Sequence, residues 1–409
     1  MLIKQAYRFE ILRPTGEQIR NMRRFAGTRR YIFNHALALN NEMYSLAGKR
    51  HTRYQLDKLI TAWKKETPWL SDAPAQTLQQ VLVDLERAYT NFREGRAKFP
   101  TFKKKGQRDS FRYPQGFKMD NANGRMELPK LGWLRYRKSQ DVEGTPKNVT
   151  VSESCGHWFV SIQTEREVQT PVHASSSEVA LDMGVAIFAT LSTGNTIMLP
   201  DTKRLEERKK FLQRRLKNKT KFSSNWRELQ TRIKKIDRRI ANIRGNHRHQ
   251  FTNTITKNHG VVYGDDLSIK NMTKSARGTM DAPGKSVKQK SGLNRSILAQ
   301  GIGEVNRQLE YKAAWRGGIY IPCPPRCGSQ RCPCCEHISK DNRKTQELFL
   351  CIQCGFSGNA DFVATLNKLE AGRAFLACGE FPSWTRFVSG TNSVKQEPAE
   401  ATMRVMAPP

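Results

Sequence analysis

Four cysteines near the C-terminus constrain the fold of this chain more than any other feature. They form two C-x2-C pairs about fifteen residues apart, Cys332 with Cys335 and Cys351 with Cys354. Each pair can turn tightly enough for both sulfurs to meet one ion, and tetrahedral Zn²⁺ accepts this spacing. The alternative, a disulfide pair or four unrelated buried thiols, is disfavoured by the regular spacing. We therefore expect a structural zinc site with no open coordination position.

Other residues lie close to these pairs along the sequence. Cys334 lies inside the first pair, and Cys323 and Cys327 precede it, so these three thiols are competing ligands. Asp361 follows the last thiol by seven residues at an expected helix start. The sequence thus places a carboxylate next to the expected zinc site.

The charge of the chain predicts a polyanionic partner. Its 409 residues include 70 lysines and arginines against 37 aspartates and glutamates, a formal net charge of +33. Nucleic acid is the polyanion that such a balance favours. A membrane-bound protein would need an anchor or an apolar helix, and we find no run of about 18 apolar residues. Residues 1–14 mix charged and apolar residues, unlike a signal peptide, so we expect a cytoplasmic protein with reduced cysteines.

The length of the chain predicts several compact units, and the hydrophobic pattern changes along it. Residues 1–12 alternate like a strand, and residues 13–116 predict a basic bundle of amphipathic helices. Residues 117–170 return to short alternating segments, which predict a small β unit that the N-terminal strand can complete. A final helix is expected at 361–376, and the polar tail at 379–409 is expected to be disordered.

Buried strands and a basic helical hairpin are expected in the middle of the chain. Two strands joined by a tight turn fit residues 178–194, and residues 201–249 carry 18 Lys/Arg against 5 Asp/Glu on near-heptad apolar spacing. Such a hairpin repels itself unless an anion lies against it, although a solvated coiled coil is the alternative. Residues 270–294 are rich in Lys, Gly, Ser and Asn and predict a mobile loop. Residues 297–315 predict a helix.

Two segments predict contacts with nucleic acid. In residues 99–115 lysines and arginines are interleaved with Phe and Tyr, which suits phosphate contact combined with base stacking. A solvated loop is the alternative there, and the hairpin at 201–249 is the second segment. The candidate contact residues are Lys103, Lys104, Lys105, Arg112, Arg214, Arg215, Lys234, Lys235, Arg238 and Arg239.

Three aspartates occupy positions where an acidic side chain is unusual. Asp182 lies inside an apolar strand, Asp265 ends another strand, and Asp361 begins a helix. A carboxylate near a sheet core is costly unless a cation meets it. Three such acids could hold two Mg²⁺ about 4 Å apart, an arrangement that activates water in phosphodiester cleavage. Each acid also has a simpler interpretation: Asp361 could cap its helix, Asp265 could be a turn residue, and Asp182 could pair with an arginine.

Several stretches of the chain, taken together, are specific to one family. They are Phe99 to Gln115, Leu128-Pro-Lys-Leu-Gly-Trp, Leu181-Asp-Met-Gly-Val, Asp266-Leu-Ser-Ile-Lys-Asn-Met, Gln308-Leu-Glu-Tyr-Lys, Ser329-Gln-Arg-Cys, Asp341-Asn-Arg-Lys-Thr-Gln and Asn359-Ala-Asp. On these motifs the chain resembles, over nearly its whole length, the TnpB family. These are the OrfB proteins of insertion sequences, which are similar to type V CRISPR effectors.

The resemblance implies a multidomain chain of α/β and α+β units built around an RNase H-like (RuvC) nuclease domain. That nuclease domain would span 177–322 and 357–378, with a zinc-binding insertion at 323–356. A wedge-like β domain, at 1–12 and 117–170, would precede it and carry a helical recognition insertion at 13–116.

The resemblance also implies an activity and its partners. Family members bind a guide RNA derived from the end of their transposon and cleave matching double-stranded DNA, with pairing to the guide reading the sequence. By position, Asp182 matches the first catalytic aspartate and Asp361 the last, so Mg²⁺ would bind at these acids and at Asp265. The four cysteines match the zinc-binding insertion, and we expect a monomer.

One departure from the family bears on cleavage. The second catalytic residue is usually Glu in a Glu-Asp-Leu context, where this chain has Asp265-Asp266-Leu267. An aspartate withdraws the carboxylate by roughly 1 Å, a displacement that can cost on the order of a hundredfold in rate. The alternative function is therefore an RNA-guided binding protein that represses transcription without cutting. A strand-joining transposase is a third hypothesis, disfavoured because no His-hydrophobe-His pair with a nearby Tyr occurs.

Overall fold

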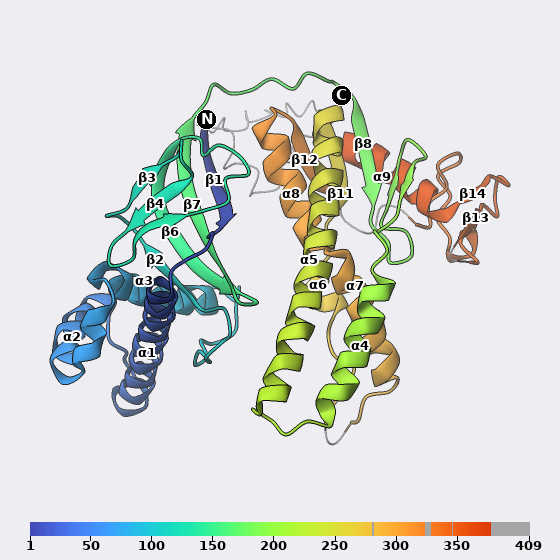
Figure 1. The fold of residues 1–409 in the computed structure, drawn as a ribbon. Coiled ribbons are helices and arrows are strands. Elements are labelled where there is room, and N and C mark those ends of the chain that lie inside the picture. Colours follow the sequence, from blue (N-terminus) through green and yellow to red (C-terminus); the bar gives the residue numbers. More distant parts are fainter. Residues whose placement is uncertain (280–281, 324–328, 346, 378–409) are drawn as a thin grey trace, which may run out of the picture. The chain divides into compact units, whose positions relative to one another are not determined.

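The computed structural model describes residues 1–279, 282–323, 329–345 and 347–377 (Figure 1). The predicted disordered tail at 379–409 lies outside these residues. The chain folds as two compact units, the first comprising residues 1–169 with 204–239, and the second residues 170–203 with those from 240 onward. Within the described ranges, no helix is both long and apolar enough to cross a membrane.

The first unit contains two antiparallel sheets. The larger has the strand order β1-β7-β6-β2, and β1 pairs with β7 along its whole length, from Leu2 opposite Glu167 to Glu10 opposite Phe159. The smaller has the order β3-β4-β5. The strands are β1 (Leu2–Glu10), β2 (Ser110–Tyr113), β3 (Lys118–Asp120), β4 (Arg125–Leu128), β5 (Gly132–Arg135), β6 (Thr145–Ser154) and β7 (His157–Glu167).

Helices between β1 and β2 pack on these sheets through one shared core. Thr15 and Thr52 each form a capping box with the glutamine three residues later, which fixes where α1 and α2 begin. Buried Phe25 of α1 and Leu82 of α3 belong to the same core as Phe111 of β2. The helices are α1 (Gly16–Ala47), α2 (Arg53–Glu66), the 3-10 helix η1 (Pro68–Asp72) and α3 (Ala75–Arg93).

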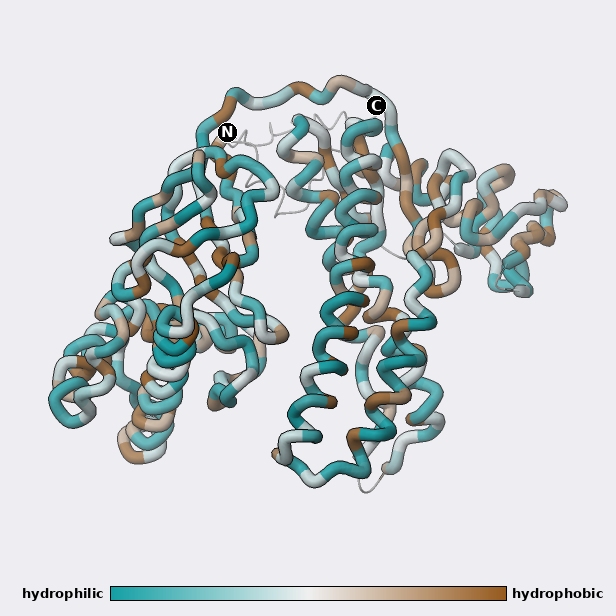
Figure 2. Tube along the Cα trace, viewed as in Figure 1, coloured by the Kyte–Doolittle hydropathy of each residue, from teal (hydrophilic) through white to brown (hydrophobic). Residues whose placement is uncertain are grey.

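The basic segment at 201–249 forms a helical hairpin of α4 (Lys203–Lys217) and α5 (Ser224–Asn258). A narrow apolar seam of Leu212, Leu229 and Ile233 joins the two helices. Figure 2 shows hydrophilic residues along most of the length of both helices. Most lysines and arginines of the hairpin are exposed, whereas Lys209, Arg238, Arg244 and Arg248 are half-buried.

The second unit is built on a five-stranded sheet of order β10-β9-β8-β11-β12. Strand β8 pairs antiparallel with β9 but parallel with β11, and β11 pairs parallel with β12. The strands are β8 (Glu178–Asp182), β9 (Ala189–Leu191), β10 (Thr196–Ile197), β11 (Val261–Asp265) and β12 (Ile319–Cys323). The carboxyl ends of β8, β11 and β12 consequently lie at one edge of the sheet.

Helices cover both faces of this sheet, so the central residues of β8 and β11 are apolar. Val179 and Val262 lie in the core with residues of α5 and α8, whereas Ala180 and Tyr263 face α9. The remaining elements are α6 (Ile269–Met272), α7 (Val287–Gln300), α8 (Ile302–Trp315), the 3-10 helix η3 (Lys340–Asn342), β13 (Leu348–Leu350), β14 (Ser357–Asn359) and α9 (Ala360–Ala377).

The structure differs from the predicted loop at 270–294 and the predicted helix at 297–315. Helix α7 begins at Val287, and Gly301 with φ 69° separates it from α8. The preceding segment is held by side chains of α7, because Lys290 Nζ donates to Met272 O at 2.9 Å and Asn294 Nδ2 to Thr273 O at 3.0 Å. These contacts between distant residues leave no signal in the local composition.

Candidate functional site

Two matching turns carry the four cysteines. The residue after each C-x2-C pair, Glu336 or Gly355, has a positive φ, of 61° and 75° respectively. Its backbone N–H donates at 3.0 Å to the carbonyl of the first cysteine of its pair. Each pair thus forms a tight knuckle in which both sulfurs face the same way.

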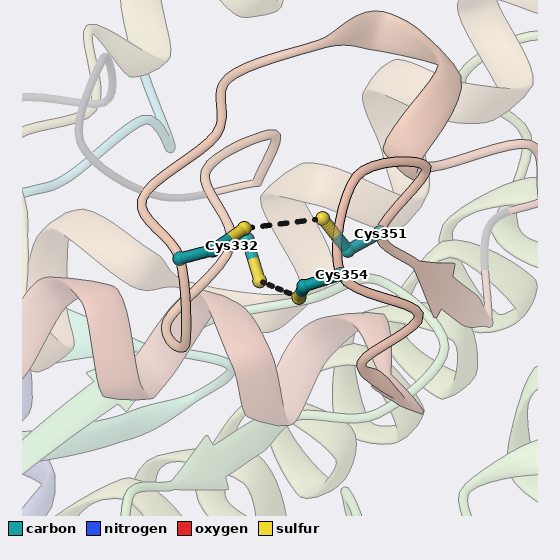
Figure 3. A group of neighbouring side chains, drawn as sticks. Cys332, Cys351 and Cys354 are labelled. Carbon is teal, nitrogen blue, oxygen red and sulfur yellow. Dashed lines mark hydrogen bonds between the residues drawn. The ribbon is translucent and has the colours of Figure 1, made fainter.

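The two knuckles bring their sulfurs together (Figure 3). All four lie within 4.8 Å of one another, with Cys332 Sγ 3.6 Å from Cys354 Sγ and Cys335 Sγ 3.5 Å from Cys351 Sγ. A tetrahedral zinc with Zn–S bonds of about 2.3 Å has sulfurs about 3.8 Å apart. The four cysteines could therefore hold a metal ion such as zinc with little movement.

Two of the three competing thiols, Cys334 and Cys323, do not join this group. Cys334 is exposed, and its backbone N–H donates to Cys332 Sγ at 3.4 Å, as residues inside such knuckles do. Cys323 is buried in β12 with its Sγ 3.9 Å from Lys368 O. Cys327 lies outside the described residues.

Backbone donors favour the metal-binding form of one thiol. Burial raises the pKa of Cys351, but hydrogen bonds from the backbone of Cys354 and Gln353 and from neighbouring thiols outweigh this and lower it to about 6. A thiolate is the form that binds a metal.

The cysteine group also packs directly on the start of α9. Phe349 and Cys332 share a small core with Ala360 and Val363 of that helix. Further along α9, Asn367 Nδ2 donates to Arg331 O at 2.7 Å. The two cysteine turns therefore fix the position of α9 and of Asp361, which lies in its first turn.

The three predicted aspartates lie around one edge of the second sheet. Asp182 ends β8 and Asp265 ends β11, the neighbouring parallel strand, so both lie at the carboxyl edge. Asp361 lies in the first turn of α9, which packs against β8. Burial raises the pKa of Asp361, and the nearby charge of Asp182 raises it further, against the opposing effect of Arg343.

A buried lysine that we did not predict joins two of these acids. Lys368 Nζ donates to Leu181 O at 2.8 Å, to Asp182 Oδ1 at 3.0 Å and to Asp265 Oδ1. Burial lowers the pKa of Lys368, but the carboxylates of Asp265 and Asp182 outweigh burial and raise it above its ordinary value. The two carboxylates therefore favour the charged form of Lys368.

The other acids of the site are also paired. Asp265 Oδ2 accepts from the backbone N–H of Met183 at 3.2 Å. Asp361 Oδ1 lies 3.2 Å from Arg343 Nη2. Asp182 itself pairs with Lys368, whereas the sequence had suggested an arginine as its partner.

Carboxylate oxygens are the ligands that Mg²⁺ prefers, so the donor chemistry of the three acids suits this ion. Their oxygens do not form one compact set, however. Among the described residues, the four cysteines are the only group of three or more His, Cys, Asp or Glu side chains whose ligand atoms all lie within 4.8 Å of one another.

The predicted nucleic-acid contacts fall into two groups. Lys103 and Arg238 are half-buried over aromatic rings. Lys103 Nζ lies 4.0 Å from the ring centroid of Phe33, and Arg238 Cζ lies 4.8 Å from that of Phe159. Arg112 is half-buried beside Asp84, at 3.8 Å. The exposed members are Lys104, Lys105, Arg214, Arg215, Lys234, Lys235 and Arg239.

Three family models match separate parts of the chain. A model described as "Probable transposase", of the OrfB proteins of IS605, matches residues 161–276. A "Cas12f1-like, TNB domain" model matches residues 303–368, which include the four cysteines, and a "Helix-turn-helix domain" model of OrfB proteins matches residues 1–49.

Two relatives align along almost their full length. The chain is 51% identical over 97% of its residues and 98% of the relative to "Putative RNA-guided DNA endonuclease InsQ" of Escherichia coli (strain K12). It is 29% identical over 98% of both chains to a "Putative RNA-guided DNA endonuclease" of Streptomyces pristinaespiralis. Among solved structures, CasPhi-2 (Cas12j) bound to crRNA is 12% identical, with a TM-score of 0.42 over 90% of this chain and 98% of that one.

These matches define a class of protein encoded by mobile elements, with a transposase-family segment and a TNB domain. The chain belongs to the TnpB family, the OrfB proteins of insertion sequences.

Proposed function

We propose that the chain is a transposon-associated, RNA-guided DNA endonuclease. It binds a guide RNA derived from the end of its element and cleaves matching double-stranded DNA by Mg²⁺-dependent phosphodiester hydrolysis. The observation that carries this proposal is that three aspartates from distant segments lie around one sheet edge in a chain half identical to a relative named as such an enzyme.

The proposed nuclease is of the RNase H (RuvC) type. It spans 177–322 and 357–378 with the zinc-binding insertion at 323–356. A sheet that combines antiparallel and parallel strands and carries its acids at the strand ends supports this assignment. A wedge-like domain at 1–12 and 117–170, with its recognition insertion predicted at 13–116, completes the proposed arrangement. The predicted insertion is not helical to its end, because β2 pairs with β6 in the sheet of the wedge-like domain.

The acids would supply the oxygen ligands of Mg²⁺. When bound, this ion activates water and stabilises the leaving oxygen in phosphodiester cleavage. The carboxylates of Asp182 and Asp361 are 27% and 31% exposed, which lets them meet a DNA phosphate through the ion. Lys368 orients Asp182 and Asp265 through its hydrogen bonds to their carboxylates. Zinc in the cysteine group would stabilise α9 without taking part in the reaction.

The exposed lysines and arginines would hold the RNA and DNA backbones. In the described part of the chain, no ion pair involves Arg214, Lys234, Lys235 or Arg239, so these side chains are available to phosphates. Such contacts give affinity but no sequence information, which pairing with the guide supplies.

One observation favours the alternative, an RNA-guided protein that binds its target and represses transcription without cutting. The single ammonium of Lys368 already pairs with the carboxylates of both Asp182 and Asp265, and Asp265 stands where the family usually has Glu. Binding to RNA and DNA requires neither acid.

Cleavage of a matched plasmid distinguishes the two functions. Protein purified with its bound RNA, which is then sequenced, should nick or cut a plasmid that matches the guide in the presence of Mg²⁺. Asp182→Ala should abolish the cut, whereas Asp141→Ala, which alters an exposed acid of the first unit, should leave it unchanged. Tight binding to an intact plasmid would instead support the repressor.

A further inference from the structure

The deepest part of the acidic site already contains a cation of the protein's own. We propose that the Lys368 ammonium is a resident cation of this site. It takes the place of one divalent cation between Asp182 and Asp265 and leaves a single divalent site at the exposed carboxylates of Asp182 and Asp361. The inference rests on the proposed function, in which these acids bind a divalent cation.

The hydrogen bonds of Lys368 identify it as a built part of the site. An ammonium has three donors, and its three acceptors here are Leu181 O at 2.8 Å, Asp182 Oδ1 at 3.0 Å and Asp265 Oδ1. Its side chain is only 7% exposed. Lys368 therefore has no spare donor. Its ammonium could not turn toward solvent without breaking hydrogen bonds to these three acceptors.

Asp265 is closed to any other cation while Lys368 is in place. Its side chain is 8% exposed, one oxygen accepts from Lys368 and the other from Met183 N. The backbone is held as well, because Asn306 Nδ2 donates to Asp265 O at 2.8 Å. Mg²⁺ demands near-octahedral oxygen coordination, which this buried carboxylate cannot enter without displacing the ammonium.

The charge of the site also limits the number of ions. The carboxylates of Asp182 and Asp265 share the ammonium of Lys368, and Asp361 pairs with the guanidinium of Arg343. These two cations of the protein already offset much of the charge of the three acids, so a second divalent cation would meet little remaining negative charge. Like charges in close proximity strongly disfavour such binding.

Lys312 provides a matched comparison within the same unit. It is also buried, but its Nζ donates to His249 O and Thr252 Oγ1, both at 2.7 Å, and to no carboxylate. Burial, with a smaller effect of Arg316, lowers the pKa of Lys312 to about 8. A buried lysine therefore does not by itself contact carboxylates. The ion pairs of Lys368 depend on the positions of Asp182 and Asp265.

The test is a Mn²⁺ titration of the full-length, zinc-loaded chain freed of nucleic acid, with unbound Mn²⁺ measured by EPR. We expect the wild-type chain to bind one Mn²⁺ that Asp361→Asn removes. Lys368→Met should bind a second Mn²⁺ and tighten total binding at least tenfold. Lys312→Met should bind like the wild type. The proposal is overturned if the wild-type chain binds two Mn²⁺, or if Lys368→Met leaves both stoichiometry and affinity unchanged.

A second variant keeps the test valid if Lys368→Met fails to fold because Asp265 is left buried and unpaired. Lys368→Met/Asp265→Asn removes both charges of the pair. It should still bind one Mn²⁺ within about threefold of the wild-type affinity, because Asp265 is not a ligand. Loss of that ion would show that Asp265 is a ligand and would overturn the proposal.

The titration contains neither RNA nor DNA, so its outcome is separate from that of the cleavage assay. A chain that cuts its target and binds two Mn²⁺ would refute the resident cation and retain the nuclease. A chain that never cuts, yet gains a Mn²⁺ site in Lys368→Met, would refute the nuclease and retain the resident cation.

Discussion

At the scale of single residues, the acidic site is governed by close packing around Asp265. Both of its carboxylate oxygens have partners, and its side chain is almost fully buried. The usual glutamate of the family would extend the carboxylate by one methylene toward Lys368. The short side chain of Asp265 and the presence of Lys368 are therefore parts of one arrangement.

Lengthening this residue should cost stability. We predict that Asp265→Glu lowers the free energy of unfolding by about 1–3 kcal/mol, because an added methylene overpacks a closed site. Asp266→Glu alters the exposed neighbour and should stay within about 0.5 kcal/mol of the wild type. Chemical denaturation measures both. If Asp265→Glu is as stable as the wild type and cuts faster, Lys368 does not occupy the space of the missing methylene.

The cysteines allow an equally specific prediction at the residue scale. Purified chain should contain about one zinc, and Cys351→Ser should lose most of it, because a four-cysteine site needs every thiolate. Cys334→Ser changes the exposed cysteine between the two ligands of the first pair and should retain its zinc. Mass spectrometry of the metal content provides the measurement. Folded wild-type protein without zinc would contradict the assignment, as would equal loss in both variants.

At the scale of elements, α9 links the cysteine group to the acidic site. Its first turn packs on the cysteine turns and carries Asp361, and two turns later it carries Lys368. Gly372 then lets the helix approach β11, because any side chain at this position would overlap the ring of Tyr263. The distance between α9 and the sheet therefore depends on the absence of a single methyl group.

This close approach predicts the effect of a small substitution. Gly372→Ala should destabilise the chain by about 1–3 kcal/mol through overpacking, less the roughly 1 kcal/mol that alanine contributes to helix propensity. Gly245→Ala is the matched control, since its methyl group in α5 would meet nothing within 4 Å, and it should be neutral or stabilising. Thermal unfolding compares the two, and a Gly372→Ala variant as stable as Gly245→Ala would contradict this packing.

Sequence reasoning located some of these features and missed others for physical reasons. The spacing of Cys332, Cys335, Cys351 and Cys354 predicted a shared site because both pairs are local turns. Lys368 was missed because a lysine in a helix usually faces solvent, although its spacing of seven residues from Asp361 places both on one face. The loop predicted at 270–294 was wrong in part, because contacts with Met272 and Thr273 order a segment that looks flexible by composition.

At the scale of the whole molecule, the net charge of +33 favours binding of a polyanion such as nucleic acid, and the acidic site is where it would be acted on. The exposed candidate contact residues lie in the loop at 104–105 and on α4 and α5, whereas the three aspartates lie around one sheet edge. Such a division suits a protein that holds nucleic acid by its backbone and acts on it at one place. The domain boundaries, monomeric state and guide origin stay predictions.

We propose that a bound RNA directs this chain to its DNA target, and a reprogrammed guide provides the test. The segment of the copurified RNA that pairs with DNA would be replaced by an unrelated sequence of about 20 nucleotides. Cut sites would then be mapped on a plasmid carrying both matching targets. We predict that the cut moves to the new match and disappears from the old one. A cut that stays at the original target, or that occurs without any RNA, would contradict the account.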